Sequence, residues 1–333
     1  MVFMAEFVST FITGFQDVVK KDLQQKFPTL KILNLFDGLI HYKFDGNSRE
    51  LEKIIYFNNT FFVLKTMKGK GLSFNSLIGA LCSSKNYFIV NKGTFRVRFQ
   101  QENQFSKVDK NLTRRVEEYV TKNSKLTLDR LSPTNEIWFS IRREGFAFCG
   151  ELISKREFTE KNLNKGELRP EIAYLMCCFA DIMPQQTILE PFCGYGSIPI
   201  QLEKHFKCKK IYISDIDKEK INLISDKKIA ASPIVSILQA DVFELAHISD
   251  NSIDTIITDP PWGLWENIEN IEDFYIRMFV SFKRVLKQQG KMIILTARTS
   301  EFENAVSQSN IRIEKSLHTL VNGKKASLYL CIY

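Results

Sequence analysis

The sequence lacks several features that mark whole classes of protein. It contains no C-x-x-C pair, and its four histidines are scattered along the chain. The seven cysteines are odd in number and irregularly spaced. A disulfide framework or a metal centre is therefore not expected, and reduced thiols in a cytoplasm are the simplest account. No uncharged apolar run approaches the roughly 20 residues of a membrane helix, and the first residues do not have the pattern of a signal peptide.

The composition is that of a folded protein, but the charge is unevenly distributed. The 333 residues give room for two or three domains, and 44% of them are hydrophobic. Residues 1–166 hold 27 Lys and Arg against 17 Asp and Glu, whereas residues 167–333 hold 19 against 21. The basic excess is strongest in residues 53–115. This asymmetry indicates a polyanion-binding module beside a second unit, unless the cations only keep a Phe-rich surface soluble.

Hydrophobic patterning divides the chain into four parts. Residues 1–60 predict a small α+β unit with a turn at Asp37-Gly38, and residues 61–154 predict a second α+β unit. Residues 155–169 are polar and irregular, as in a linker. Residues 170–333 alternate strand and helix patterns, which predicts a doubly wound α/β sheet. Asn322-Gly323 predicts a hairpin that adds an antiparallel edge strand.

A glycine-bearing turn follows the first strand of the back half. The segment TILEPFCGYGSIPIQ (187–201) passes from a strand, through Gly194 and Gly196, into a helix. Glycine lets the backbone bend tightly and lets a ligand approach it. A dinucleotide motif needs a third glycine where Pro199 stands, which disfavours NAD or FAD. S-adenosylmethionine has no pyrophosphate, and its cationic amino-acid end suits Glu190. Taken alone, the G-x-G pattern could be no more than a tight loop.

Acidic residues end the next two strands. Asp215 lies 19 residues beyond Gly196, where an acid reaches a ribose diol in this architecture. Asp217 competes for that role or caps the following helix. Asp241 is placed to accept a hydrogen bond from an adenine amino group, with the Val242 amide beside it. Each acid alone would be a cap or a solvated loop residue, but their joint placement at strand ends indicates a ligand site.

The most specific motif is Asp259-Pro260-Pro261-Trp262, directly after a strand that reads as buried. Two prolines stop the strand and stiffen the turn. The Asp259 carboxylate and the Pro260 carbonyl can accept both N–H bonds of an exocyclic amine and localise its lone pair for attack. Asp259 is also a candidate to take up the proton. Trp262 offers a flat face for a base that has left its stack. The alternative is a purely structural role, in which the segment is a rigid loop and the tryptophan belongs to the core.

In this order, EPFCGYGS, SDID, QADVF and DPPWG resemble the motifs of class I S-adenosylmethionine-dependent methyltransferases that modify amino groups. FRVRFQ, the Arg114-Arg115 helix and the strands up to Glu151 resemble a THUMP domain, and residues 1–60 resemble the ferredoxin-like unit that often precedes it. The resemblance implies a Rossmann-like catalytic domain with a seven-stranded sheet and a closing hairpin. It implies an enzyme that methylates the N2 of guanosine, typically in tRNA and in some cases in rRNA.

The resemblance also implies site residues. Catalysis is expected at Asp259, Pro260, Pro261 and Trp262. The expected cofactor contacts are Glu190, Pro191, Cys193, Gly194, Gly196, Asp215, Ile216, Asp241, Val242 and Asp259. The expected RNA contacts are Lys68, Lys70, Arg96, Arg98, Arg114 and Arg115, which would bind phosphate groups.

The sequence departs from the family pattern at three positions and leaves other functions open. Glu190 stands where Asp is frequent, Tyr195 where Ser or Thr is frequent, and Trp262 where Tyr is usual. Because Trp is better known in adenine-N6 enzymes, adenine stays an alternative to guanine. An RNA-binding protein with an inactive methyltransferase fold is the alternative outside enzymes. A nicotinamide-dependent oxidoreductase is disfavoured because it leaves the Pro-Pro-Trp segment unexplained.

Overall fold

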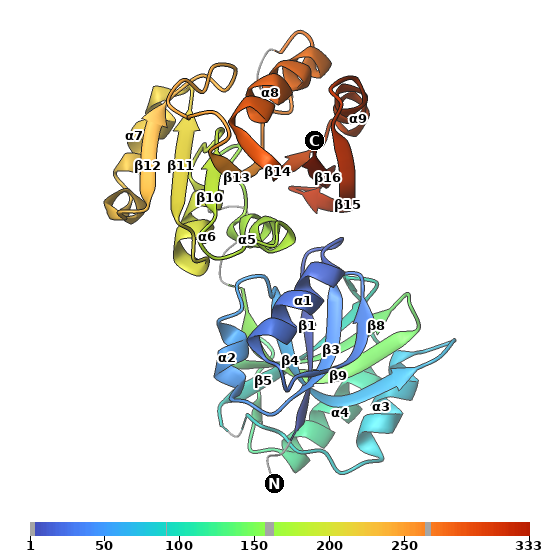
Figure 1. The fold of residues 1–333 in the computed structure, drawn as a ribbon. Coiled ribbons are helices and arrows are strands. Elements are labelled where there is room, and N and C mark those ends of the chain that lie inside the picture. Colours follow the sequence, from blue (N-terminus) through green and yellow to red (C-terminus); the bar gives the residue numbers. More distant parts are fainter. Residues whose placement is uncertain (1–3, 91, 157–162, 264–267) are drawn as a thin grey trace. The chain divides into compact units, whose positions relative to one another are not determined.

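The computed structural model describes residues 4–90, 92–156, 163–263 and 268–333. By its internal contacts the chain forms two compact units, of residues 1–11 with 23–157 and of residues 12–22 with 158–333 (Figure 1). Within the described ranges, no helix combines the length and the apolar character that crossing a membrane requires.

The first part of the chain builds a nine-stranded sheet. The strands run β2-β3-β1-β4-β9-β8-β5-β6, and β7 pairs with β5. In chain order the elements are β1 (Ala5–Thr10), α1 (Gln16–Lys26), β2 (Lys31–Phe36), β3 (Leu39–Phe44), α2 (Ser48–Glu52), β4 (Asn59–Lys68), α3 (Phe74–Cys82), β5 (Thr94–Gln101), β6 (Gln104–Phe105), α4 (Lys110–Asn123), β7 (Thr127–Leu128), β8 (Asn135–Arg142) and β9 (Phe146–Lys155).

Alternation along β5 separates a core face from a polar face. Phe95 and Phe99 are buried in a cluster that also contains residues of α3 and α4. Arg96 and Arg98 point to the opposite face, where both reach the carboxylate of Glu136 on β8. Apolar and charged side chains thus alternate along this strand with the period of two that a half-buried strand requires.

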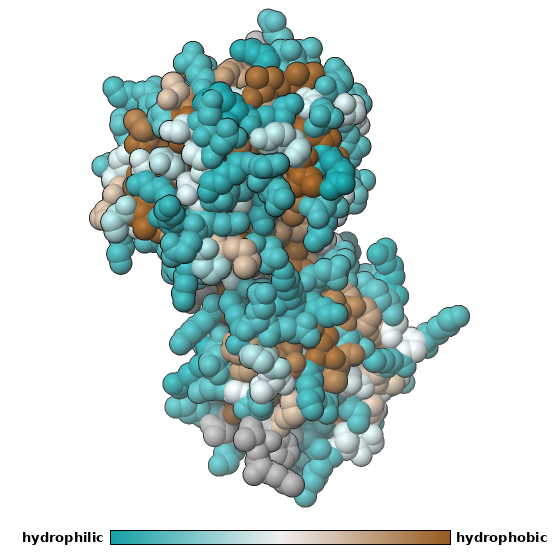
Figure 2. Space-filling model, viewed as in Figure 1, coloured by the Kyte–Doolittle hydropathy of each residue, from teal (hydrophilic) through white to brown (hydrophobic). Residues whose placement is uncertain are grey.

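The sheet of this unit is strongly curled. Phe36 on β2 and Phe146 on β9 have ring centroids 5.2 Å apart, although β3, β1 and β4 lie between their strands in the sheet order. The concave side encloses a second apolar cluster that includes Phe61, Trp138 and Phe148. Figure 2 shows mainly hydrophilic residues on the visible face of this unit, with hydrophobic ones gathered over β3 and β9.

The nine-stranded sheet includes strands from both of the predicted domains, residues 1–60 and residues 61–154. Strand β4 pairs with β1 on one side and with β9 on the other. The pairing of β1 with β4 therefore joins residues 5–10 to the second predicted domain. The division into domains at residues 60 and 154 stays a prediction.

The second unit confirms the predicted doubly wound fold with its closing hairpin. Its sheet has the order β12-β11-β10-β13-β14-β16-β15 and is parallel from β12 to β14. Strand β16 is antiparallel to both of its neighbours, so the antiparallel strand lies between β14 and the edge strand β15 instead of at the edge itself. The elements are α5 (Pro170–Phe179), β10 (Thr187–Glu190), α6 (Ser197–His205), β11 (Lys210–Asp215), α7 (Lys218–Ser225), β12 (Val235–Gln239), β13 (Ile253–Thr258), α8 (Ile271–Val285), β14 (Leu286–Thr296), α9 (Thr299–Gln308), β15 (Arg312–Val321) and β16 (Lys324–Ile332).

Helices cover this sheet and fix its strand ends. Helices α8 and α9 pack together over one face, where Tyr275, Phe279 and Phe302 are fully buried against β13 and β14 (Figure 1). The predicted hairpin is present, and both Asn322 and Gly323 have positive φ, as a tight two-residue turn requires. After β11, helix α7 ends at Ser225, and a separate 3₁₀ turn follows at Lys228–Ala231.

Candidate functional site

A cavity of about 820 Å³ lies at the carboxyl ends of the parallel strands of the second unit. It is lined by segments that follow β10, β11, β12 and β13, together with residues 163–168 and the β15–β16 turn. Twelve of the predicted cofactor and catalytic residues line it: Glu190, Pro191, Cys193, Gly194, Asp215, Ile216, Asp241, Val242, Asp259, Pro260, Pro261 and Trp262. Gly196 is buried beside the loop and is not among the lining residues.

The glycine loop has a backbone that only glycine adopts easily. Gly194 and Gly196 have φ values of 48° and 83°, and Gly196 caps the start of α6. A Cβ atom on Gly194 would meet nothing within 4 Å, whereas one on Gly196 would lie 2.5 Å from the Cδ1 atom of Ile224. Gly194 therefore leaves space on the cavity side, and Gly196 leaves space for the packing of α7.

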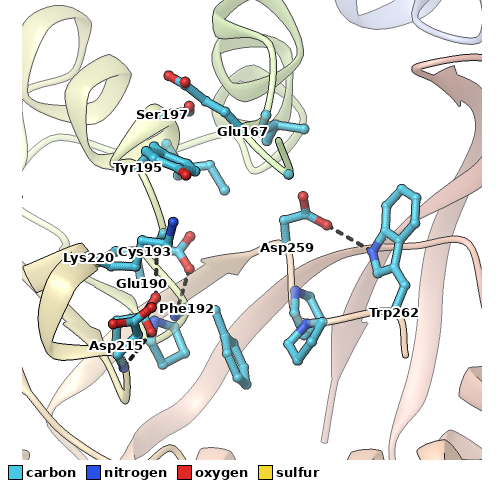
Figure 3. A pocket seen from close by; sticks show the side chains of 18 of the residues that line it. Glu167, Glu190, Phe192, Cys193, Tyr195, Ser197, Asp215, Lys220, Asp259 and Trp262 are labelled. Atoms are coloured by element: carbon cyan, nitrogen blue, oxygen red, sulfur yellow. Dashed lines mark hydrogen bonds between the residues drawn. The ribbon is translucent and has the colours of Figure 1, made fainter. Parts of the chain in front are cut away.

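Two lysines that the sequence analysis did not single out hold the bulky residue of this loop. Lys227 Nζ donates to the carbonyl oxygen of Tyr195 at 2.5 Å. Lys220 Nζ lies 3.6 Å from the centre of the Tyr195 ring and also lines the cavity (Figure 3). Both lysines come after β11 and approach the loop only through tertiary folding, so local sequence carries no signal for them.

Glu190 ends β10 and is fully buried. Its Oε1 atom accepts hydrogen bonds from Thr258 Oγ1 at 2.6 Å and from the Phe192 N–H at 3.0 Å. Its Oε2 atom is buried and has no hydrogen-bond partner among the described residues. Burial raises the pKa of this carboxyl group well above its usual range, against the opposing effect of the two hydrogen bonds. A cationic ligand group beside Oε2 would stabilise the ionised form.

The two acids after β11 both line the cavity but make different hydrogen bonds. Asp215 Oδ2 accepts from the Gly194 N–H at 2.9 Å, so it ties the end of β11 to the glycine loop. Desolvation raises its pKa from the ordinary value. Asp217 accepts from the Glu219 N–H at 2.8 Å and caps α7. The structure thus places both acids at the cavity, where Asp215 holds the glycine loop and Asp217 also caps α7.

Apolar and polar groups after β11 and β12 complete this side of the cavity. The side chain of Ile216 is 65% exposed although it is a large hydrophobic residue. Asp241 Oδ1 accepts from the Phe243 N–H at 2.9 Å, and Val242 is buried beside it. An exposed isoleucine and a carboxylate in the lining of one cavity suit a flat heterocycle that carries an amino group.

On the far side of the cavity, the Asp-Pro-Pro-Trp segment follows β13. Trp262 Nε1 donates to Asp259 Oδ1 at 2.9 Å, with a longer approach of 3.4 Å to the Leu295 carbonyl oxygen (Figure 3). Arg298, at the start of α9, donates through Nε to the Trp262 carbonyl oxygen at 2.9 Å. The sequence analysis did not anticipate the Asp259–Trp262 bond or the role of Arg298, because Arg298 lies 36 residues further along the chain.

The predicted RNA contacts all lie in the first unit, in two different environments. Lys68, Lys70, Arg114 and Arg115 are exposed. Arg96 and Arg98 are partly buried and share Glu136 as an ion-pair partner. Their charge is therefore partly balanced within the protein, which the strand pattern alone could not reveal.

The cavity residues fit S-adenosylmethionine. The unpartnered Oε2 of Glu190 suits its ammonium group, Asp215 suits a ribose diol, and the exposed Ile216 with Asp241 suits an adenine. The open side of Gly194 leaves room for a ligand against the backbone. The cavity volume is also within the range of small-molecule sites. Within the described ranges, no group of three or more His, Cys, Asp or Glu side chains could hold a metal ion.

Comparison with known proteins places this site in a family. The chain is 24% identical over 220 residues to the tRNA (guanine(6)-N2)-methyltransferase of Thermus thermophilus. The alignment covers 64% of this chain and 65% of that protein, so the chain spans slightly less than two thirds of the length of this relative. The crystal structure of TrmN from Thermus thermophilus covers 98% of both chains with a TM-score of 0.78 and 20% identity. The structure of SMU.472 complexed with SAH covers 99% and 98%, with a TM-score of 0.71 and 14% identity.

The two solved structures establish the fold over nearly the whole chain. A family model described as the RMKL-like methyltransferase domain matches residues 156–326, which is slightly more than half of the sequence and contains every residue of the cavity. The predicted cofactor, S-adenosylmethionine, agrees with this match. The chain therefore belongs to the RMKL-like methyltransferase domain family.

Proposed function

We propose that this protein transfers a methyl group from S-adenosylmethionine to the exocyclic N2 amine of a guanosine in tRNA. One observation carries the proposal: the Asp259 carboxylate lines the same cavity as Glu190, Asp215 and Asp241. The residues that suit the cofactor and the carboxylate that can accept an amine N–H therefore line the same cavity. The guanine-N2 activity of the Thermus thermophilus relative supports the choice of amine and of RNA.

The residues of the chain contribute mainly by positioning. S-adenosylmethionine supplies, when bound, a methyl group activated by its sulfonium centre. Asp259 and the Pro260 carbonyl would accept the N–H bonds of the guanine amine and direct its lone pair toward the cofactor side of the cavity. Because an aryl amine is a weak nucleophile, localising its lone pair and accepting its proton at Asp259 are the steps that need the protein.

Substrate binding would use the basic first unit. Residues 61–154 are proposed to act as a THUMP domain that binds RNA through phosphate contacts from Lys68, Lys70, Arg114 and Arg115. Arg96 and Arg98 stay candidates, although their shared pairing with Glu136 lowers the charge that they offer to a phosphate. The target base would leave its stack before it reaches Asp259.

The test is to incubate the protein with S-adenosylmethionine and unmodified bulk tRNA, digest the RNA to nucleosides and measure their masses. The expected product is N2-methylguanosine, and it should be missing with Asp259→Asn. N6-methyladenosine would overturn the base assignment while it retains the amine chemistry. Methylation of rRNA but not tRNA would overturn the substrate assignment only.

An RNA-binding protein with an inactive methyltransferase fold is the competing proposal. The intact cavity speaks against it, because a chain without cofactor has no need for a buried, unpartnered Glu190 oxygen. Calorimetric titration with S-adenosylhomocysteine separates the two. Binding without any RNA methylation, or no binding at all, would favour the inactive fold.

A further inference from the structure

The hydrogen bond between Trp262 and Asp259 takes up one acceptor position of the carboxylate that the substrate amine needs. The indole Nε1–H donates to Oδ1 of Asp259 at 2.9 Å. Donation of an N–H to a carboxylate is the same interaction that an exocyclic amine would make there. In the protein without substrate, an N–H of the chain therefore takes the place of an N–H of the base.

We propose that Trp262 is a specificity residue whose indole N–H holds Asp259 until the amine of the substrate base replaces it. This inference rests on the proposed function. A base that brings its own N–H donor restores the bond to Asp259 when the indole leaves. A base with only an acceptor at that position breaks the bond without replacing it, and is rejected.

The geometry of the ring favours exchange over simultaneous binding. An indole N–H lies in the ring plane, so Asp259 Oδ1 lies close to the edge of Trp262 and not over its face. A base stacked on Trp262 would lie over the face instead. Trp262 therefore has to turn before its face can receive a base that donates to the same oxygen.

The described contacts of Trp262 hold its backbone and leave its side chain partly exposed. Arg298 Nε holds the Trp262 carbonyl oxygen at 2.9 Å, which fixes the backbone, and Pro261 precedes Trp262. The Trp262 side chain is only partly buried. Water can therefore take over its N–H after the exchange, so that no buried donor is left unpaired.

The kinetic test uses Trp262→Phe, which removes the N–H and keeps an aromatic face. We expect the KM for bulk tRNA to fall several-fold, at most about tenfold, because the indole N–H no longer competes with the substrate amine for Asp259. Because Phe keeps an aromatic face for the base, we expect the fall in KM to exceed any change in kcat. The affinity for S-adenosylhomocysteine, measured by calorimetry, checks that the variant is folded. A kcat that falls tenfold or more at unchanged KM would overturn the exchange and make the N–H a permanent support of Asp259.

The spectroscopic test follows the indole N–H itself in ¹⁵N-labelled full-length protein. The Trp262 signal is assigned as the one missing in Trp262→Phe, and tRNA is added to protein saturated with S-adenosylhomocysteine. We expect this signal to shift toward the position of a water-exposed indole. A signal that does not move when tRNA is bound would refute the exchange. If the wild type forms no N2-methylguanosine, the proposed function fails and takes this inference with it; an active wild type with either contrary result overturns the exchange alone.

Discussion

Changing each of the two glycines of the predicted cofactor loop to alanine should affect a different property: ligand affinity at Gly194 and stability at Gly196. Both have positive φ, so an alanine at either position costs about 1 kcal/mol in backbone strain. They differ in what the added methyl group meets. At Gly194 it enters open space at the cavity wall, and at Gly196 it lies 2.5 Å from Ile224 Cδ1, inside the fold.

The magnitudes follow from these contacts. Gly194→Ala should lower the free energy of unfolding by only about 1 kcal/mol, but should raise the Kd for S-adenosylhomocysteine tenfold or more. The methyl group would occupy ligand space, and overpacking by one such group costs about 1–3 kcal/mol. Gly196→Ala should lower the free energy of unfolding by about 2–4 kcal/mol, since Ile224 has to shift, with a Kd changed less than threefold.

The assay is denaturant unfolding for stability and calorimetric titration with S-adenosylhomocysteine for affinity. Each variant serves as the control for the other, since both carry the same chemical change two residues apart. Our interpretation of the loop would be refuted if Gly196→Ala, at temperatures where it is folded, lost more affinity than Gly194→Ala. Equal losses of stability in the two variants would refute the inference that a methyl group on Gly196 points into the packing with Ile224.

Three further predictions concern other parts of the chain. Asp259→Asn keeps the shape of the side chain but removes its charge, so RNA methylation should fall about 10²–10⁴-fold while the Kd for S-adenosylhomocysteine, measured by calorimetry, stays within twofold. Burial raises the pKa of Glu151 to about 7 despite hydrogen bonds from the Ile89 and Val90 N–H groups. Between these two pKa values the folded state binds more protons than the unfolded chain, so this group should lower the free energy of unfolding by about 3 kcal/mol as pH rises from about 4.5 to 7. Urea unfolding at pH 5 and pH 8 should show a smaller fall in Glu151→Gln than in the wild type. An unchanged pH dependence in that variant would contradict the prediction. Arg114→Ala should reduce the slope of log K for tRNA against log salt by about 1, whereas Arg96→Ala, whose guanidinium pairs with Glu136, should change that slope less and lower the melting temperature instead.

Much of the catalytic fold could be predicted because its signals are local. The Gly194–Gly196 turn, the strand ends at Asp215 and Asp241, and the Asn322-Gly323 hairpin each depend on residues within one short segment. The parallel sheet then follows from the alternation of strands and helices, because its crossover connections have one favoured hand. The first unit was harder to predict. Its strand order brings β1 beside β4 and β9 beside β4, and period-2 patterns state only that strands exist.

The part of the site that resisted prediction is the part that joins distant segments. The Asp-Pro-Pro-Trp motif identified Asp259 as an acceptor and Trp262 as a flat ring, but it could not show that the ring donates to the acceptor. That bond depends on a side-chain torsion, and the backbone that carries it is held by Arg298 from the next helix. Lys220 and Lys227 likewise reach Tyr195 from beyond β11. Residue identity thus indicates what a group can do, whereas tertiary contacts decide which partner it has when the substrate arrives. For Asp259 this difference is the one between a free base and an acceptor already in use, and it changes the expected effect of Trp262→Phe from a loss of turnover to a gain in substrate affinity.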